Sequence, residues 1–234
     1  MGRGLISVVA PVAAVTGANV NYEGSLSIDP DLMDQAGLLP YERILCSNMA
    51  NAAPSADVAP ALIALNATAK IVGANGDRTV TLEEFFRGPG QTVMSSDEIL
   101  TEITIPKTGP RLVGEYIKFS PREMMDLAYV GVAVAYNLGN SDKKCDGARI
   151  VLGAVAPTPL RAKRAEAALE GQVLTEALAE KVGEIAAEEA RPISDVRSSA
   201  DYRRAMVGAM TKRALLNAAV GPAKSWVERR ERRY

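Results

Sequence analysis

The chain has 234 residues, of which 47% are hydrophobic and 24% charged, an ordinary composition for a globular protein. This length fits one large domain or two to three small ones. The formal net charge of −1 excludes the strong positive field that recruits nucleic acid or an anionic membrane. Because the sequence has no histidine, it excludes His-based triads, His general bases and His-containing metal sites.

The two cysteines, Cys46 and Cys145, lie far apart in different sequence contexts, so they predict reduced thiols in a cytoplasmic protein. The apolar run at residues 5–15 contains Pro11 and follows a single charge, which favours a structured segment over a secretion signal. No apolar run approaches the roughly 20 residues that a membrane-spanning helix requires. We therefore expect no partner of nucleic acid or membrane type.

The pattern of residues 1–46 predicts short β segments and turns, followed by a short helix that ends at Gly37. Residues 14–43 resemble the N-terminal region of the aspartate 1-decarboxylases, which cleave themselves at a Gly-Ser bond to make a pyruvoyl group. Gly24-Ser25 matches that processing site. After Cys46 the resemblance ends, before the cation and proton donor that decarboxylation needs. A β-hairpin leading into a short helix is therefore the favoured interpretation.

Small residues dominate positions 48–57, so this backbone can lie close against a ligand. Asn48 and Asp57 supply the strong hydrogen-bonding side chains at its two ends, and Pro54 fixes a turn between them. Ser55 and Asp57 stand where an N-cap and a first-turn acid would begin a helix. Such a junction can hold a polar, often phosphorylated cofactor, although for this stretch taken alone a plain loop-to-helix connection is the favoured interpretation. The apolar positions of the expected helix are Ala59, Leu62, Ile63 and Leu65.

The next segment predicts a β-hairpin, with strands at 67–72 and 78–81 joined through an Asn-Gly turn. Thr81 and Glu84 form a capping box for a short helix. Residues 98–105 then predict a strand. Its alternation places Leu100, Glu102 and Thr104 on one face, opposite Ile99, Thr101, Ile103 and Ile105.

The remainder predicts an antiparallel meander backed by helices. Strands are expected at 113–120, 128–138 and 148–155, with Tyr116 and Lys118 on one face of the first. Helices are expected at 160–169, after the cap Thr175, and from 198 to about 219. The apolar stripe of the last helix is expected to be Tyr202, Met206, Ala209, Met210 and Leu216. Three strands with three helices make an α+β module that can bury its own core.

Seven motifs in this order resemble the FAD-binding medium subunit of the molybdenum hydroxylases, a family that includes the carbon monoxide and xanthine dehydrogenases. The resemblance covers roughly residues 47–234. The motifs are residues 48–57, Phe85-Phe86-Arg87-Gly88-Pro89, residues 97–106, Lys118-Phe119-Ser120, residues 126–134, residues 153–162, and Asp195 with Tyr202-Arg203-Arg204.

The resemblance implies an α+β fold in three parts: a β-rich segment at 1–46, the second lobe of an FAD-binding domain at 47–112, and a C-terminal domain at 113–234. The C-terminal part would be a three-strand antiparallel sheet with a three-helix bundle. The family's first lobe, with its glycine-rich pyrophosphate loop, is expected to be replaced by residues 1–46. Cys46-Ser47 stands where the family has a Gly-Gly pair.

The same resemblance implies that FAD is the cofactor and that Ser47, Asn48 and Asp57 contact it from the small-residue loop. Leu100 would pack against FAD and Lys118 would lie near it. Leu100 as ordinary core, and Lys118 as a solvent-facing residue on an edge strand, are the alternatives. No side chain is expected to be catalytic and none to bind a metal, because the cofactor carries the redox chemistry.

The implied function is an oxidoreductase subunit that passes electrons from iron–sulfur and molybdopterin partner subunits through FAD to an acceptor. Two other hypotheses remain. One is a truncated or fused, non-catalytic assembly module. The other is a pyruvoyl-dependent decarboxylase that processes itself at Gly24-Ser25.

Overall fold

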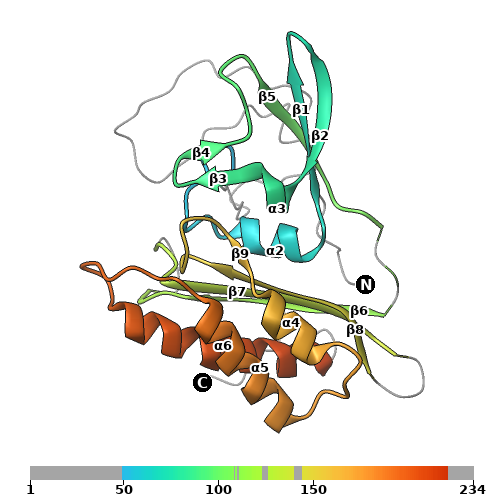
Figure 1. The fold of residues 1–234 in the computed structure, drawn as a ribbon, viewed down its shortest axis with the longest axis vertical. Helices are drawn as coiled ribbons and strands as arrows, with labels where there is room; N and C mark the ends of the chain where they lie inside the picture. Colours follow the sequence, from blue (N-terminus) through green and yellow to red (C-terminus); the bar gives the residue numbers. More distant parts are fainter. Residues whose placement is uncertain (1–48, 108, 110, 123–125, 140–143, 221–234) are drawn as a thin grey trace, which may run out of the picture. The chain divides into compact units, whose positions relative to one another are not determined.

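The computed structural model describes residues 49–107, 109, 111–122, 126–139 and 144–220, and all of them belong to one compact unit (Figure 1). The elements expected at 1–46, Cys46, and the expected cofactor contacts Ser47 and Asn48 lie outside the described residues. No helix within the described ranges is both long enough and apolar enough to cross a membrane.

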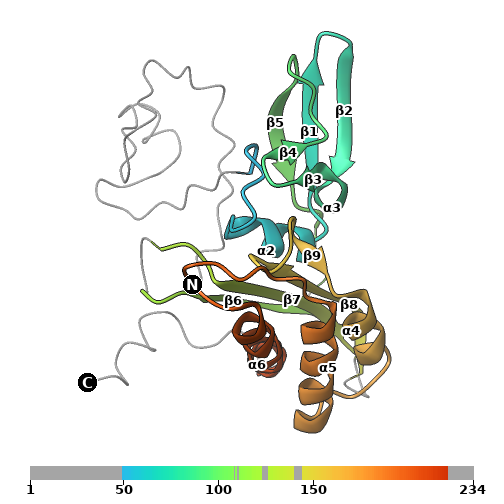
Figure 2. The same cartoon turned by 60° about the vertical axis from the view of Figure 1, so that its left-hand side comes forward.

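The C-terminal part is an antiparallel sheet with helices on one face (Figures 1 and 2). Its strands are β6 (Leu112–Phe119), β7 (Val130–Leu138), β8 (Cys145–Gly153) and β9 (Leu160–Arg161), in the order β6-β7-β8-β9. The expected meander is confirmed, with a fourth strand added. The helices are α4 (Lys163–Leu169), α5 (Glu176–Glu189) and α6 (Ala200–Ala219).

Strand β7 lies between two hydrophobic cores, and its sequence alternates accordingly. Val130, Val132, Val134 and Tyr136 belong to the core shared with α4, α5 and α6. Ala133 and Ala135 belong to a second core on the opposite face of the sheet. Large side chains on one face and small ones on the other leave room for a helix to approach closely.

The part that precedes this sheet contributes the second core. It contains α2 (Val58–Ala64), β1 (Thr68–Gly73), β2 (Gly76–Thr81), α3 (Leu82–Phe85), β3 (Phe86–Gly88), β4 (Gln91–Thr92) and β5 (Ile99–Thr104). Strands β2, β1 and β5 form one antiparallel sheet, and β3 pairs with β4. Ile63, Ile71, Leu82 and Phe85 pack in this core together with Ala133, Ala135 and Val151 of the C-terminal sheet.

Several local predictions are confirmed. The hairpin of β1 and β2 forms. The amide of Glu84 donates to Thr81 Oγ1 at 3.3 Å, the first bond of a capping box, whereas the Glu84 carboxylate accepts from the Thr81 hydroxyl at 2.9 Å. Thr175 caps α5 by accepting from the amide of Leu178 at 3.2 Å. Each of these signals acts within a few residues of the chain, so its outcome depends little on the rest of the fold.

The prediction of one helix over 160–169 was wrong at its start. Leu160 and Arg161 extend the sheet as β9 and pair with Leu152 and Val151, so α4 begins only at Lys163. The backbone N–H and C=O groups along the edge of β8 need hydrogen-bond partners, and the short strand β9 supplies those partners.

The predicted apolar stripe of α6 was wrong in part, because Met206, Met210 and Leu216 pack in or against the core as expected but the other two members do not. Tyr202 is 50% exposed and Ala209 is exposed, whereas the buried face includes Arg203, Val207 and Met210. Each residue turns an α-helix by about 100°, so a one-residue shift moves the buried face substantially. Arg203 is drawn inward because Nη2 donates to Asp195 Oδ1 at 2.7 Å and the guanidinium lies 5.9 Å from the ring centre of Tyr129.

A β-bulge overturns the predicted faces of β5. The pairing of β1 with β5 matches Lys70 with Glu102 and then Ile71 with Leu100, which leaves Thr101 as the extra residue. Leu100 and Ile103 consequently both pack against the second core, rather than on opposite faces. An extra residue in one strand reverses the alternation beyond it.

Candidate functional site

The small-residue loop ahead of α2 is built from two consecutive turns. The amide of Ala52 donates to Met49 O at 3.1 Å, and the amide of Ala56 donates to Ala53 O at 3.0 Å. Ala52 has φ 46°, a left-handed conformation that is uncommon for residues with a side chain. The loop therefore holds a strained backbone geometry of the kind found at ligand sites.

Two distant segments hold this loop in place. The amide of Gly90 donates to Ala52 O at 3.1 Å, and the amide of Ala154 donates to Pro54 O at 3.0 Å. Ala154 follows β8 directly and also has a positive φ, of 62°. The loop is thus fixed between the β3–β4 turn and the end of the C-terminal sheet.

A pair of glycines lets α2 approach that sheet. Gly131 of β7 and Gly153 of β8 lie opposite each other in the ladder. A Cβ atom on Gly153 would lie 2.7 Å from Cγ of Pro60 in α2, and one on Gly131 would lie 2.9 Å from the Tyr116 hydroxyl. Gly153 therefore lets Pro60 of α2 lie directly against the sheet, and Gly131 leaves room for the Tyr116 hydroxyl.

Asp57 and Lys118, two of the residues expected to contact the cofactor, form an ion pair at this junction. Lys118 Nζ lies 2.7 Å from Asp57 Oδ2 and also donates to the carbonyl oxygen of Asp126 at 2.6 Å. The two side chains are only 26% and 24% exposed. Lys118 does lie on an edge strand, as the alternative interpretation expects, but its side chain is paired and largely covered instead of facing solvent.

The expected capping role of Ser55 and Asp57 takes a different form. Asp57 occupies the N-cap position of α2, but no side-chain cap hydrogen bond forms there. The Asp57 carboxylate accepts from the ammonium of Lys118 instead. In this pair both partners are charged, whereas in a carboxylate cap only the acceptor is.

The pair retains unused hydrogen-bonding capacity. Asp57 Oδ1 is buried and has no hydrogen-bond partner among the described residues. An ammonium group has three N–H donors, and the bonds to Asp57 and Asp126 account for two of them. Because a buried polar atom without a partner is costly, this arrangement fits a ligand that offers a donor to Asp57 and an acceptor to Lys118.

Tyr116 lies on the same face of β6 and completes the polar surroundings. Burial raises the pKa of the Tyr116 hydroxyl, and the negative charge of Asp57 raises it further. The phenol therefore stays neutral at any working pH. The strand pattern placed Tyr116 and Lys118 on one face, but the sequence motifs gave no sign that Tyr116 belongs to the site.

Leu100 remains a predicted cofactor contact. It is partly buried on the inner face of β5 and packs against the same core as Tyr116. Its packing matches the alternative of ordinary core.

Two family models match the chain. Residues 44–108 match the FAD binding domain in molybdopterin dehydrogenase, and residues 115–218 match the CO dehydrogenase flavoprotein C-terminal domain. The xanthine dehydrogenase FAD-binding subunit of Escherichia coli O157:H7 is 30% identical over 172 residues, covering 73% of this chain and 58% of the relative. The carbon monoxide dehydrogenase medium chain of Hydrogenophaga pseudoflava is 37% identical over 161 residues, covering 68% and 55% respectively.

The chain belongs to the family of these FAD-binding medium subunits. The solved carbon monoxide dehydrogenase of Hydrogenophaga pseudoflava superposes with a TM-score of 0.69 at 34% identity, over 82% of this chain and 63% of that one. The reconstituted CO dehydrogenase of Oligotropha carboxidovorans gives 0.70 at 31% identity, over 75% and 60%. The chain thus spans less than two thirds of the length of each of these medium-subunit relatives.

The family matches begin at residue 44. The decarboxylase resemblance of residues 14–43, including Gly24-Ser25, lies outside the described residues and remains a prediction.

Proposed function

We propose that the chain is the FAD-binding polypeptide of a molybdenum-hydroxylase-type oxidoreductase. The observation that carries this proposal is the Asp57–Lys118 pair at the end of the small-residue loop, with Asp57 Oδ1 buried and lacking a partner in the described part of the chain. FAD fits such a site because it carries N–H and hydroxyl donors as well as many acceptor oxygens and nitrogens. When bound, FAD would supply the electron-transfer chemistry, and the protein would position it.

In this proposal the residues bind and orient, and none is catalytic. Asp57 Oδ1 accepts a hydrogen bond from the cofactor, and the remaining N–H of Lys118 donates one. The neutral phenol of Tyr116 forms part of the wall, and Leu100 provides apolar contact. Ser47 and Asn48 extend the contact along the loop backbone.

The proposed division places the cofactor lobe at 47–112 and the flavoprotein C-terminal domain at 113–234, with the β-rich segment at 1–46. The partners would be an iron–sulfur subunit and a molybdopterin subunit that deliver electrons to FAD. The names of the relatives support this, since one is a medium chain of carbon monoxide dehydrogenase and one solved structure is a Cu,Mo-CO dehydrogenase.

The test is FAD binding to the purified chain, followed by absorbance and by the thermal midpoint of unfolding. A ligand that binds only the folded state at 100 times its Kd adds about 2.7 kcal/mol to the free energy of unfolding. We expect FAD to raise the midpoint, and Lys118→Met or Asp57→Asn to weaken FAD binding at least about tenfold, since a hydrogen bond to a charged group contributes about 1.5–3 kcal/mol.

The chain offers a matched control. Lys70 and Asp77 form an ion pair of similar length, 3.0 Å, but their side chains are 43% and 52% exposed. Lys70→Met and Asp77→Asn should leave FAD affinity unchanged. A colourless protein whose unfolding midpoint ignores added FAD contradicts the proposal.

One observation favours the alternative of a non-catalytic assembly module. Asp57 and Lys118 already satisfy part of each other's polarity, and the carbonyl oxygen of Asp126 accepts a second N–H of the lysine. Co-purification with partner subunits in stoichiometric amounts, but without flavin, would favour this alternative. Mass spectrometry addresses the decarboxylase hypothesis, since self-processing at Gly24-Ser25 would split the 24.8 kDa chain into two fragments.

A further inference from the structure

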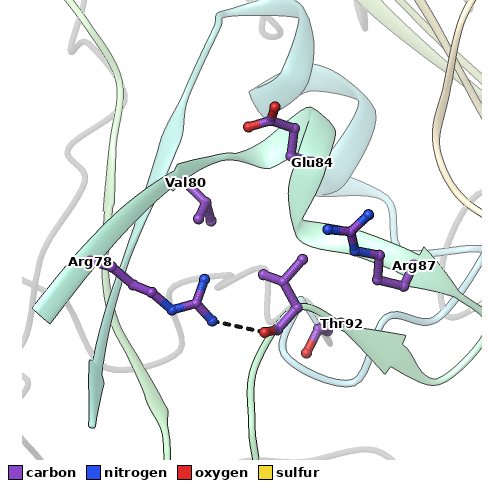
Figure 3. Close-up of a pocket in the computed structure, with 6 residues that line it drawn as sticks. Arg78, Val80, Glu84, Arg87 and Thr92 are labelled. Carbon is purple, nitrogen blue, oxygen red and sulfur yellow. Dashed lines mark hydrogen bonds between the residues drawn. The ribbon is translucent and has the colours of Figure 1, made fainter. Parts of the chain in front are cut away.

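A polar cavity of about 500 Å³ lies between β2, α3 and the β3–β4 hairpin (Figure 3). It shares no residue with the Asp57–Lys118 site. Its lining comes from segments close in sequence within the lobe at 47–112, so it does not depend on how that lobe meets any other part. The lining residues are Arg78, Val80, Glu84, Arg87, Thr92 and Val93.

Arg78 is held rigidly at one wall of this cavity. Its Nε donates to Glu98 Oε1 at 2.9 Å, and its Nη2 donates to Glu98 Oε2 at 2.8 Å and to Val93 O at 2.8 Å. A guanidinium has five N–H donors, so this fork fixes the side chain and leaves Nη1 with its two donors. A cation that is already oriented loses less entropy when it binds an anion.

Arg87 stands at the opposite wall. It is an exposed residue of β3, and within the described part of the chain no carboxylate lies at ion-pair distance from it. In Figure 3 the guanidinium groups of Arg78 and Arg87 point toward the same gap. Two arginines therefore converge on the cavity from different strands.

Two further side chains define what the cavity can accept. Thr92 Oγ1 accepts from the amide of Met94 at 3.2 Å, so its hydroxyl proton can be donated to a ligand. Glu84 Oε2 accepts from the Thr81 hydroxyl at 2.9 Å, and in Figure 3 its carboxylate points away from the two guanidinium groups.

We propose that this cavity binds the phosphoryl group of a small phosphate monoester. Arg78 and Arg87 offer donors from two sides of the cavity and Thr92 adds a hydroxyl, and several donors of this kind suit the oxygens of a tetrahedral phosphate. A planar carboxylate would satisfy only one guanidinium fork at a time. The volume of about 500 Å³ exceeds that of phosphate alone and leaves room for the group esterified to it.

The charge balance predicts modest affinity. Glu98 neutralises much of the charge of Arg78, and Glu84 contributes a negative charge close to the cavity. Glu84→Gln removes that charge and keeps an acceptor for Thr81, so it should strengthen phosphate binding. Arg87→Ala removes a cation for which the described residues provide no carboxylate partner, so it should weaken binding.

The experiment is calorimetric titration of the full chain with inorganic phosphate and with phenyl phosphate at low ionic strength, with succinate as the carboxylate probe. We expect one saturable site for both phosphates, weaker by at least about tenfold in Arg87→Ala. The matched control is Arg213→Ala, which removes an exposed arginine of α6 and should change nothing. Thermal unfolding verifies that every variant is folded.

Four results would overturn the proposal. These are no saturable phosphate binding, equal affinity in the Arg87→Ala and Arg213→Ala variants, succinate binding as tightly as phosphate, and weaker binding in Glu84→Gln. FAD is titrated separately. If Arg87→Ala abolishes FAD binding, the cavity holds the phosphates of the proposed cofactor and is not a separate site. A chain that binds phosphate but not FAD would refute only the proposed function.

Discussion

Asp57 begins a helix and also contributes the negative charge of the candidate site. The N-cap position puts its side chain at the N-terminus of α2, where a hydroxyl or carboxylate would usually accept from the helix backbone. Lys118, 61 positions further along the chain, takes the carboxylate instead at 2.7 Å. The helix N-terminus therefore lacks its side-chain cap, and the site gains a fixed carboxylate.

The stability that the Glu98 carboxylate contributes to the fold should depend on pH. Hydrogen bonds from Arg78 and from the amide of Ser95 hold the pKa of Glu98 at about 2, below its ordinary 4.5. Because the pKa is depressed in the folded state, its stabilising contribution is present above pH 4.5 and is lost as the pH falls toward 2. The urea midpoint of the wild type should exceed that of Glu98→Gln at pH 7, and the difference should shrink across that window.

The control for this prediction is Glu102→Gln. Glu102 lies on β5 and is exposed, so its replacement removes a similar charge without disturbing the Arg78 fork. A difference between wild type and Glu98→Gln that stays constant down to pH 2.5 would contradict the argument, and so would an equal effect of Glu102→Gln.

At the scale of elements, α5 and α6 cross at a pair of glycines. A Cβ on Gly183 of α5 would lie 2.5 Å from the carbonyl oxygen of Gly208 in α6, whereas a Cβ on Gly208 would meet its nearest atom at 3.5 Å. The contact is therefore asymmetric. Backbone against backbone cannot yield as a flexible side chain could, so the two positions should respond differently to alanine.

We expect Gly183→Ala to lower the free energy of unfolding by about 1–3 kcal/mol, because overpacking outweighs the better helix propensity of alanine. Gly208→Ala should be neutral or stabilising by up to about 1 kcal/mol, since only the propensity changes. Chemical denaturation of the two variants measures both values. Equal effects at the two positions would show that the crossing is looser than the structure indicates.

At the scale of the whole described unit, a charged cluster links α3 to the C-terminal sheet and helices. Arg161 of β9 binds Glu166 of α4 through two hydrogen bonds, at 3.0 and 2.6 Å, and its Nη1 lies 2.9 Å from Glu83 of α3. Glu166 is 7% exposed and also accepts from the amide of Ile150 at 2.9 Å. The buried carboxylate is thus paired and hydrogen-bonded, as burial of a charge requires.

Substitution of Gly153, where β8 packs against α2, tests whether the two hydrophobic cores depend on each other. Gly153→Ala would force Pro60 and α2 away from the sheet, which should cost about 1–3 kcal/mol of unfolding free energy. It should also weaken the proposed FAD binding, because Asp57 moves with α2. Gly109→Ala, where no atom of the described residues lies within 4 Å of the added Cβ, is the control and should stay within about 0.5 kcal/mol of wild type.

Gly131→Ala extends that test. Its Cβ would meet the hydroxyl of Tyr116, the end of a side chain that can shift more easily than the ring of Pro60 in a helix. We therefore expect a smaller loss than for Gly153→Ala, measured by the same denaturation experiment. A larger loss at Gly131 than at Gly153 would mean that Tyr116, and not α2, sets the spacing.

The sequence by itself determined the features whose causes lie within a few residues. The hairpin at 67–81, the caps at Thr81 and Thr175 and the antiparallel meander all follow from local backbone chemistry. The motifs also predicted that Asp57 and Lys118 belong to one site. They did not predict that these two side chains bind each other.

Only the tertiary structure decided which partner each group found. Leu160 and Arg161 pair with the edge of β8 and form a strand instead of the first turn of a helix. A β-bulge at Thr101 places Leu100 on the same face of β5 as Ile103. Asp195 turned Arg203 into the buried face of α6. Each outcome depends on a hydrogen bond, charge or packing contact with another segment of the fold, and such contacts leave no periodic signal in the sequence.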